Sequence, residues 1–137
     1  SVARAVSADG TVIVGDSDGQ QGTEAFVWTA ESGLVGLGDL PGGPFVSRAQ
    51  GVSADGSVVV GSGRLPDVEG SSSTEAFRWT AETGLVSIGD LPGGIAATNS
   101  SAYDVSADGS VIVGSGRTDN GNEAFRWTEE TGMVGLG

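Results

Sequence analysis

The chain has 137 residues, 25 of them glycine, and its 18 acidic and 6 basic side chains give a formal net charge of −12. Such a surface repels phosphate backbones and anionic lipid heads, so we expect neither nucleic acid nor membrane insertion among its partners. The sequence contains no cysteine, which excludes disulfides, thiol nucleophiles and cysteine-type zinc sites within this chain.

One ten-residue segment occurs three times, at 6–15, 52–61 and 105–114, and each copy is followed by Glu-Ala-Phe-x-Trp-Thr. A unit that returns about every fifty residues predicts an array of stacked copies. We therefore expect one repeat array with three units, 1–43, 44–94 and 95–137. Ser1 to Arg4 resemble the middle of a strand, and the last copy stops before Asp-Leu-Pro-Gly-Gly, so we interpret the sequence as a segment of a longer or processed chain.

The second copy contains every part of the unit and predicts four strands. A first strand at 47–53 leads into Asp55-Gly56, a pair that adopts the positive backbone angles of tight hairpins. The second strand, 57–61, has three consecutive valines, which indicates burial on both faces. A third strand at 75–80 places Phe77 and Trp79 on one face, and a fourth spans 85–88 before 89–94 break the sheet.

Four antiparallel strands in chain order, repeated about every fifty residues, are typical of a β-propeller blade. The copies differ in length only between the second and third strands and between units, where a blade would be exposed. The alternative is a parallel β-solenoid, whose coils are shorter and lack hairpin turns. We predict an all-β fold of three tandem four-stranded antiparallel blades of propeller type, closing or extending by association.

The order of strands and motifs is similar to that of WD40-type propellers, with Trp28, Trp79 and Trp127 near the ends of third strands. The chain resembles, over essentially its whole length, the HAF repeats of bacterial extracellular proteins. The motifs that carry this resemblance are Val-Ser-Ala-Asp-Gly-Ser-Val-Val-Val-Gly, then Glu-Ala-Phe-Arg-Trp-Thr, then Gly-Leu-Val-x-x-Gly-Asp-Leu. Glu24, Glu75 and Glu123 stand where those repeats have histidine. The resemblance implies secretion or surface display, a propeller-like fold and no assigned catalytic residues, and it names no ligand.

Recurring carboxylates raise the question of catalysis. Asp9, Asp55 and Asp108 occupy identical turns, and we interpret them as turn residues that hydrogen-bond the backbone. Without histidine, lysine or cysteine, the chain cannot assemble Ser–His, Cys–His or Ser–Lys nucleophilic pairs. We therefore expect no catalytic residues and no enzyme, and we keep a glycoside hydrolase with a carboxylate pair as a third hypothesis.

Three further residue sets suggest binding or modification. Asp16, Asp18 and Asp119 lie in predicted loops between second and third strands, where oxygen ligands suit calcium, although the same residue types build ordinary turns. We expect no resident cofactor. Asn99 begins an Asn-Ser-Ser glycosylation pattern in a predicted exposed loop. The three tryptophans could stack on a glycan, but their same-face spacing from phenylalanines predicts a core role.

The number of blades predicts assembly. A propeller closes with about four to eight blades, and this chain supplies three. We therefore expect copies to associate head to tail, as a ring if the rotation closes and as a fibre if it does not. The predicted contact residues belong to the first and third units, with one alternation of each set facing outward: Val12, Val14, Phe26, Trp28, Val111, Val113, Phe125 and Trp127.

Two functional hypotheses follow from this organisation. The first is a non-catalytic extracellular structural protein of bacterial origin that self-assembles through its terminal blades. The second is a propeller module within a longer surface protein that binds a glycan or a protein through its loops.

Overall fold

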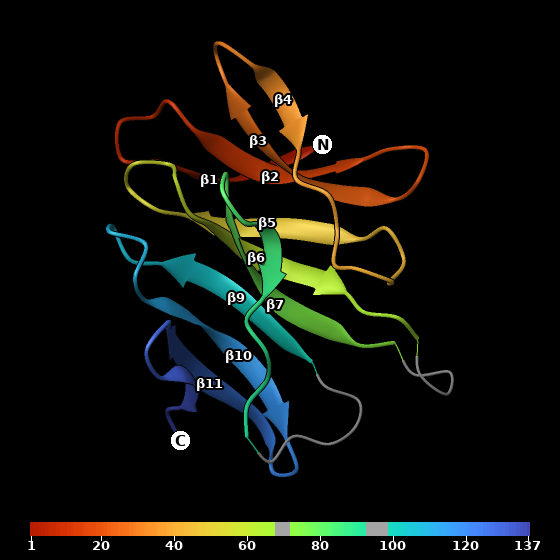
Figure 1. The fold of residues 1–137 in the computed structure, drawn as a ribbon, viewed down its shortest axis with the longest axis vertical. Coiled ribbons are helices and arrows are strands. Elements are labelled where there is room, and N and C mark those ends of the chain that lie inside the picture. The colour runs from red at the N-terminus through yellow and green to blue at the C-terminus, as the bar shows by residue number, and fades with distance from the viewer. Residues whose placement is uncertain (68–71, 93–98) are drawn as a thin grey trace.

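The computed structural model describes residues 1–67, 72–92 and 99–137, which form three four-stranded antiparallel sheets (Figure 1). Blade 1 contains β1 (Val2–Val6), β2 (Ile13–Asp18), β3 (Thr23–Thr29) and β4 (Gly33–Gly36). Blade 2 contains β5 (Ser47–Val52), β6 (Val59–Arg64), β7 (Thr74–Thr80) and β8 (Gly84–Ser87). Blade 3 contains β9 (Ser100–Val105), β10 (Ile112–Thr118), β11 (Gly121–Thr128) and β12 (Gly132–Gly135).

Each sheet lies within one of the three predicted units, and each strand pairs with its neighbour in the sequence. All pairings within the sheets are antiparallel, and the two isolated parallel bridges, Thr23 with Val46 and Thr74 with Asn99, join neighbouring blades. This confirms the predicted blades and rules out a parallel solenoid for the described residues. The described residues contain no helix long and apolar enough to cross a membrane.

The blades stack face to face in chain order, from blade 1 near the N-terminus to blade 3 near the C-terminus (Figure 1). The first strands contact one another in sequence, β1 with β5 and β5 with β9. Each first strand has one bulged residue, at Arg4, Gln50 and Tyr103. Since bulges increase the local twist of a strand, the repeated bulge gives the three blades the same curvature.

Two hydrophobic cores hold the stack together. The core between blades 1 and 2 contains Val14, Ala25, Leu40, Ala49, Val52, Val59 and Phe77. The core between blades 2 and 3 contains Val58, Val60, Ala76, Leu91, Ala102, Val105, Ile112, Phe125 and Met133. Val58, Val59 and Val60 are all buried and divide between the two cores, which confirms the prediction that this part of blade 2 is covered on both faces.

The turn between the first two strands is longer than the sequence predicts, because β6 begins at Val59 rather than Ser57. The Asp55 carboxylate accepts hydrogen bonds from the Ser53 hydroxyl (2.8 Å), the Ser57 amide (3.0 Å) and the Ser57 hydroxyl (2.7 Å). Gly56 has a φ of 77°, a left-handed conformation that glycine adopts without steric cost. The network therefore holds residues 53–58 as a turn rather than a two-residue hairpin.

Asp108 makes the same hydrogen bonds in blade 3, to Ser106 and Ser110. Hydrogen bonds from the serines favour the ionised form, so the pKa values of Asp55 and Asp108 are each lowered from 3.8 to about 2. A lowered pKa in the folded state means that these turns stabilise the fold above the unfolded pKa. That contribution is lost as the pH falls toward 2.

The double substitution Asp55→Asn and Asp108→Asn should therefore lower stability at pH 7 and also flatten its pH dependence between pH 4 and pH 2. Urea denaturation followed by circular dichroism across that range measures both effects. The exposed Glu82→Gln substitution, which lies in another turn, is the control. An unchanged pH dependence in the double variant would contradict this role of the turn carboxylates.

Candidate functional site

Every blade has two faces with different side chains. In blade 2, the upstream face carries Val59 and Phe77 and packs on blade 1. The downstream face carries Val60 and Ala76 and packs on blade 3. Blade 1 packs on blade 2 through its downstream face, and blade 3 through its upstream face. This leaves two end faces, the upstream face of blade 1 and the downstream face of blade 3, which we consider the candidate interaction site.

The downstream end face exposes residues whose equivalents are buried in the other blades. Val113 is 42% exposed, whereas Val14 and Val60 at the same position are 0% exposed. Ala124 is likewise exposed, although its equivalents Ala25 and Ala76 are 0% exposed. Leu136, next to the end of β12, is 60% exposed. This face therefore has the composition of an interior surface without the blade that would cover it.

The upstream end face shows the same difference. Leu34 is 50% exposed, whereas Met133 at the same position of blade 3 is 8% exposed. Val6 is 56% exposed, although its equivalent Val52 is 9% exposed. Ala3 is also exposed, and its equivalents Ala49 and Ala102 are fully buried. Both ends of the stack thus present apolar positions that are buried or partly buried where a neighbouring blade is present.

The eight residues predicted for self-association divide between end faces and interior. Val12 and Val14 lie on the downstream face of blade 1 and pack against blade 2, and Phe125 and Trp127 pack against blade 2 from blade 3. These four residues are therefore not on an end face, because successive side chains of a strand point to opposite sides. The strand alternation places Phe26, Trp28, Val111 and Val113 on the end faces.

Phe26 is only 4% exposed despite lying on an end face. It pairs with Gly15 across β2 and β3, as Phe125 pairs with Gly114 in blade 3. A Cβ added at Gly114 would come within 2.7 Å of the Phe125 ring, so the ring lies directly over the glycine. Phe26 is thus buried without an upstream blade, which the sequence pattern alone did not indicate.

Buried serines link neighbouring blades. The Ser47 hydroxyl accepts a hydrogen bond from the Ala25 amide (3.0 Å) and donates one to the Gly38 carbonyl (2.5 Å). Ser100 repeats this between blades 2 and 3, accepting from the Ala76 amide (2.9 Å) and donating to the Gly89 carbonyl (3.0 Å). Each serine belongs to the first strand of one blade and satisfies backbone groups of the preceding blade.

The glutamates that stand where the HAF repeats have histidine make contacts with the backbone of their own blades. Glu24 accepts a hydrogen bond from the Gly38 amide (2.9 Å), and Glu123 accepts one from the Gly137 amide (3.1 Å). Burial is the main cause that raises the pKa of Glu75 in blade 2, and a hydrogen bond from Ser87 opposes this effect. Glu24 and Glu123 therefore fix the segment that follows the fourth strand of their blades.

The turns between the first two strands form a second line of contacts between blades, along the edge where these turns align (Figure 1). The Ala8 amide donates to the Ala54 carbonyl, and the Ala54 amide donates to the Ala107 carbonyl, each at 3.0 Å. The side chain of Val12 lies against Gly56, where an added Cβ would come within 2.5 Å of its Cγ2 atom. The same contact joins Val58 to Gly109.

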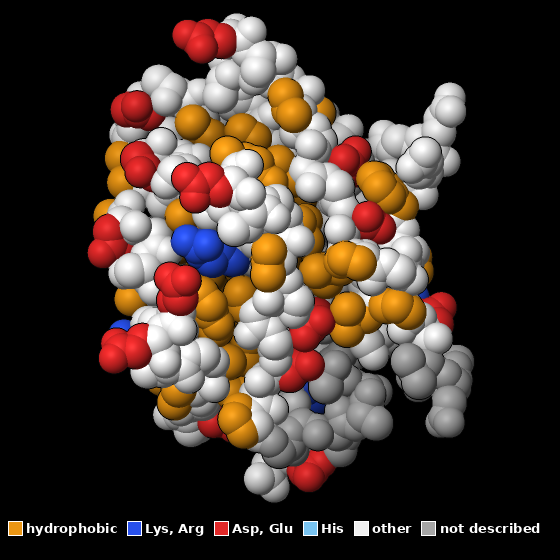
Figure 2. All heavy atoms as spheres, in the orientation of Figure 1, with side chains coloured by type: hydrophobic (Ala, Val, Ile, Leu, Met, Phe, Trp, Pro, Cys, Tyr) orange, Lys and Arg blue, Asp and Glu red, His pale blue; other side chains and the backbone are white. Residues whose placement is uncertain are grey.

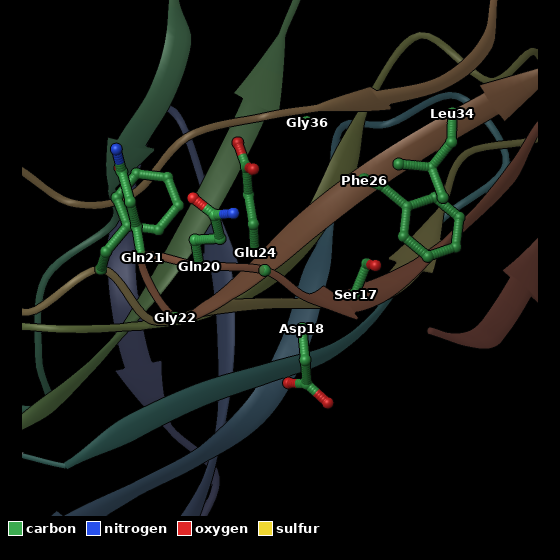
Figure 3. A pocket seen from close by; sticks show the side chains of 11 residues that line it. Ser17, Asp18, Gln20, Gln21, Gly22, Glu24, Phe26, Leu34 and Gly36 are labelled. Carbon is green, nitrogen blue, oxygen red and sulfur yellow. The ribbon is translucent and has the colours of Figure 1, made fainter.

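A shallow hollow of about 360 Å³ lies on the upstream end face of blade 1, and Figure 3 shows its lining. Phe26 and Leu34 lie together at one end, Gln20, Gln21 and Glu24 gather at the other, and Asp18 points away from them. Asp18 accepts a hydrogen bond from the Thr23 hydroxyl (2.8 Å). The two carboxylates of this hollow are therefore directed apart and are each hydrogen-bonded to the protein.

The calcium candidates are not brought together. Asp16 and Asp18 lie in β2 rather than in a loop, so the prediction of loop ligands at these two positions is wrong. Asp16 is also only 7% exposed and forms an ion pair with Arg4. Asp119 is exposed in the turn between β10 and β11. No group of three acidic side chains that could hold a metal ion occurs among the described residues, and loop residues 68–70 lie outside them.

Asn99 is half-buried rather than fully exposed. Its side-chain oxygen accepts a hydrogen bond from the Thr74 amide (3.2 Å), which joins blade 3 to blade 2. The three tryptophans are half-buried, and Trp79 and Trp127 pack against the two cores. Acidic side chains are scattered over the surface shown in Figure 2, and exposed apolar side chains lie among them.

No family model and no curated protein matches the sequence. Solved structures similar to the fold include a putative TolB from Agrobacterium tumefaciens, with a TM-score of 0.69 and 15% identity over 96% of this chain. TolB from Acinetobacter baumannii has a TM-score of 0.64 and 13% identity over 98% of this chain. The chain spans only 44% and 31% of those two proteins. This similarity supports the propeller type of the three blades.

The linking serines allow a direct test of the contacts between blades. Ser47→Ala and Ser100→Ala should each lower the free energy of unfolding by about 1–3 kcal/mol, because buried backbone groups lose their partners. Ser1→Ala changes the equivalent exposed position of blade 1 and should shift stability by less than about 0.5 kcal/mol. Urea denaturation of dilute protein measures all three, and equal effects at the three positions would contradict the linking role.

Proposed function

We propose that this chain is a non-catalytic structural repeat module that associates head to tail through its two end faces. The observation that carries the proposal is the exposure of Leu136 (60%), Val113 (42%) and Leu34 (50%). Val14 and Val60, which are equivalent to Val113, are 0% exposed, and Met133, which is equivalent to Leu34, is 8% exposed. Exposed apolar surface of this kind favours association, since burial of such surface removes it from water.

The two end faces complement each other rather than themselves. Inside the stack, the downstream face of one blade packs on the upstream face of the next. Blade 3 ends the stack with a downstream face, and blade 1 begins it with an upstream face, so the two end faces can pack in the same way. Contact between copies is therefore heterologous, with blade 3 of one chain against blade 1 of the next. Two copies supply six blades, which lies within the range of about four to eight found in closed propellers.

We place this module outside the bacterial cytoplasm. The resemblance of its repeats to those of bacterial extracellular proteins supports this location. The net charge of −12 keeps such a protein soluble while its apolar end faces pair. Phosphate backbones and anionic membranes are disfavoured partners for the same reason.

The second candidate function is a ligand-binding propeller module in a longer surface protein. The coverage of only 44% and 31% of the two similar structures favours it, because further blades of the same chain could cover the end faces. In that case the loops of the completed propeller would bind a glycan or a protein. Both candidates require the end faces to be covered, and they differ in whether a second copy does so.

The first candidate predicts a concentration-dependent mass. Multi-angle light scattering after size exclusion should give 13.5 kDa at high dilution and twice that value at micromolar concentration. Leu136→Asp should weaken association more than tenfold, because it places a charge in a desolvated apolar contact.

Val134→Asp is the matched control for this experiment. Val134 is 46% exposed, and its equivalents Val35 and Val86 remain 47% exposed although a blade follows each of them. Position 134 should therefore stay in solvent in the assembled protein, and the variant should associate like the parent chain. A single species of 13.5 kDa at every concentration would exclude self-association by this chain.

A further inference from the structure

Three kinds of contact between blades repeat in the structure: the linking serines, the hydrogen bonds between alanine turns, and the valines that cover a turn glycine. At each end of the stack, one partner of each contact remains unused. The unused groups on blade 3 are of the kind that pairs with the unused groups on blade 1. We infer from this that Ser1 of a second copy docks on the Ala124 amide and a backbone oxygen of Gly137, as Ser47 docks on Ala25 and Gly38. The inference rests on the proposed head-to-tail association and specifies its register.

The seat for this serine is already formed in blade 3. Gly137 has a φ of 94°, close to the 85° of Gly38 and the 84° of Gly89, whose carbonyls accept the linking serines. Glu123 holds the Gly137 amide as Glu24 holds the Gly38 amide. The Leu136 amide donates to the Ala124 carbonyl at 2.8 Å, as the Leu37 amide does to the Ala25 carbonyl.

The strand that would dock at this seat is β1 of the second copy, and its residues match those of the internal first strands. Ser1 precedes Ala3 with the same spacing that separates Ser47 from Ala49 and Ser100 from Ala102. Ala3 pairs with Gly15 as Ala49 pairs with Gly61, so the backbone register of the two strands is the same. Ser1 is exposed, whereas Ser47 is 0% and Ser100 is 1% exposed. Ser1 therefore has the position of a linking serine that no blade covers in this structure.

The turns between the first two strands supply two more pairs of complementary groups. The Ala107 amide is the next donor in the series of Ala8 and Ala54, and the Ala8 carbonyl is the next acceptor. Val111 follows Val12 and Val58 in the series of valines that cover a turn glycine. Gly10 is the glycine at the other end, and a Cβ added there would meet nothing within 4 Å. Docking of Ser1 on blade 3 brings both pairs together in the same register.

The joint differs from the two internal ones in a leucine contact. Leu40 and Leu91 pack against Gly63 and Gly116, where an added Cβ would lie 3.1 Å and 3.0 Å from the leucine side chains. Blade 1 has Ser17 at the equivalent position. The joint between copies is therefore expected to lack this leucine contact and to be weaker than the contacts within one chain.

Engineered cysteines test the register directly, because the chain contains none of its own. The contact between Ser47 and the Ala25 amide brings these two residues within disulfide range of each other. The double variant Ser1→Cys and Ala124→Cys should therefore yield disulfide-linked copies on mild oxidation at micromolar concentration. The control, Ser1→Cys with Val134→Cys, places the second cysteine on the neighbouring strand outside the seat and should yield at least tenfold less.

The readout is the fraction of linked species on non-reducing gels, together with the mass of the same samples in reductant. Efficient linking of the seat variant with little linking of the control supports the inference. Association of both variants in reductant with no preferential linking at the seat would overturn the inference and leave head-to-tail association intact. Failure of the unmodified chain to associate at all would overturn both.

Discussion

The structure depends on one constraint of β-sheets: a strand that is apolar on both faces needs a covering layer on each side. Val58, Val59 and Val60 meet this requirement in blade 2, where they divide between two cores. A lone blade of this composition would leave both faces in water, so the blades are stable only as a stack. The proposed association of the ends applies the same requirement to the first and last members of that stack.

Polar contacts determine how the apolar faces fit. The linking serines, the glutamates that hold the segment after the fourth strand, and the alanine turns all connect backbone groups that would otherwise lack partners. Since such groups are costly to bury unpaired, they favour one register between neighbouring blades over the many that apolar packing alone would allow. Gly114, opposite Phe125, leaves room for the aromatic ring over its own sheet.

The sequence predicted the strands, their pairing and the burial of the central valines, because these follow from periodicity and repetition. It did not predict which side chains of each terminal blade lie on the exposed end face. Successive side chains of a strand point to opposite faces of the sheet, and the sequence pattern does not indicate which face a neighbouring blade covers. The prediction for Asp16 is wrong because an aspartate near a glycine resembles a loop residue, whereas the backbone of Asp16 pairs with Val2 and Ala25 in the sheet. The proposed roles of Ser1, Ala124 and Leu136 emerge only when the exposure of equivalent positions is compared.

Amide hydrogen exchange at Ala124 gives the sharpest test of head-to-tail association, because Ala25 and Ala76 provide internal references for the same position when it is covered. If copies associate in this way, the Ala124 amide exchanges fast in dilute protein and approaches the protection of the other two as concentration rises. Fast exchange at Ala124 at every concentration, with Ala25 and Ala76 protected throughout, would contradict it.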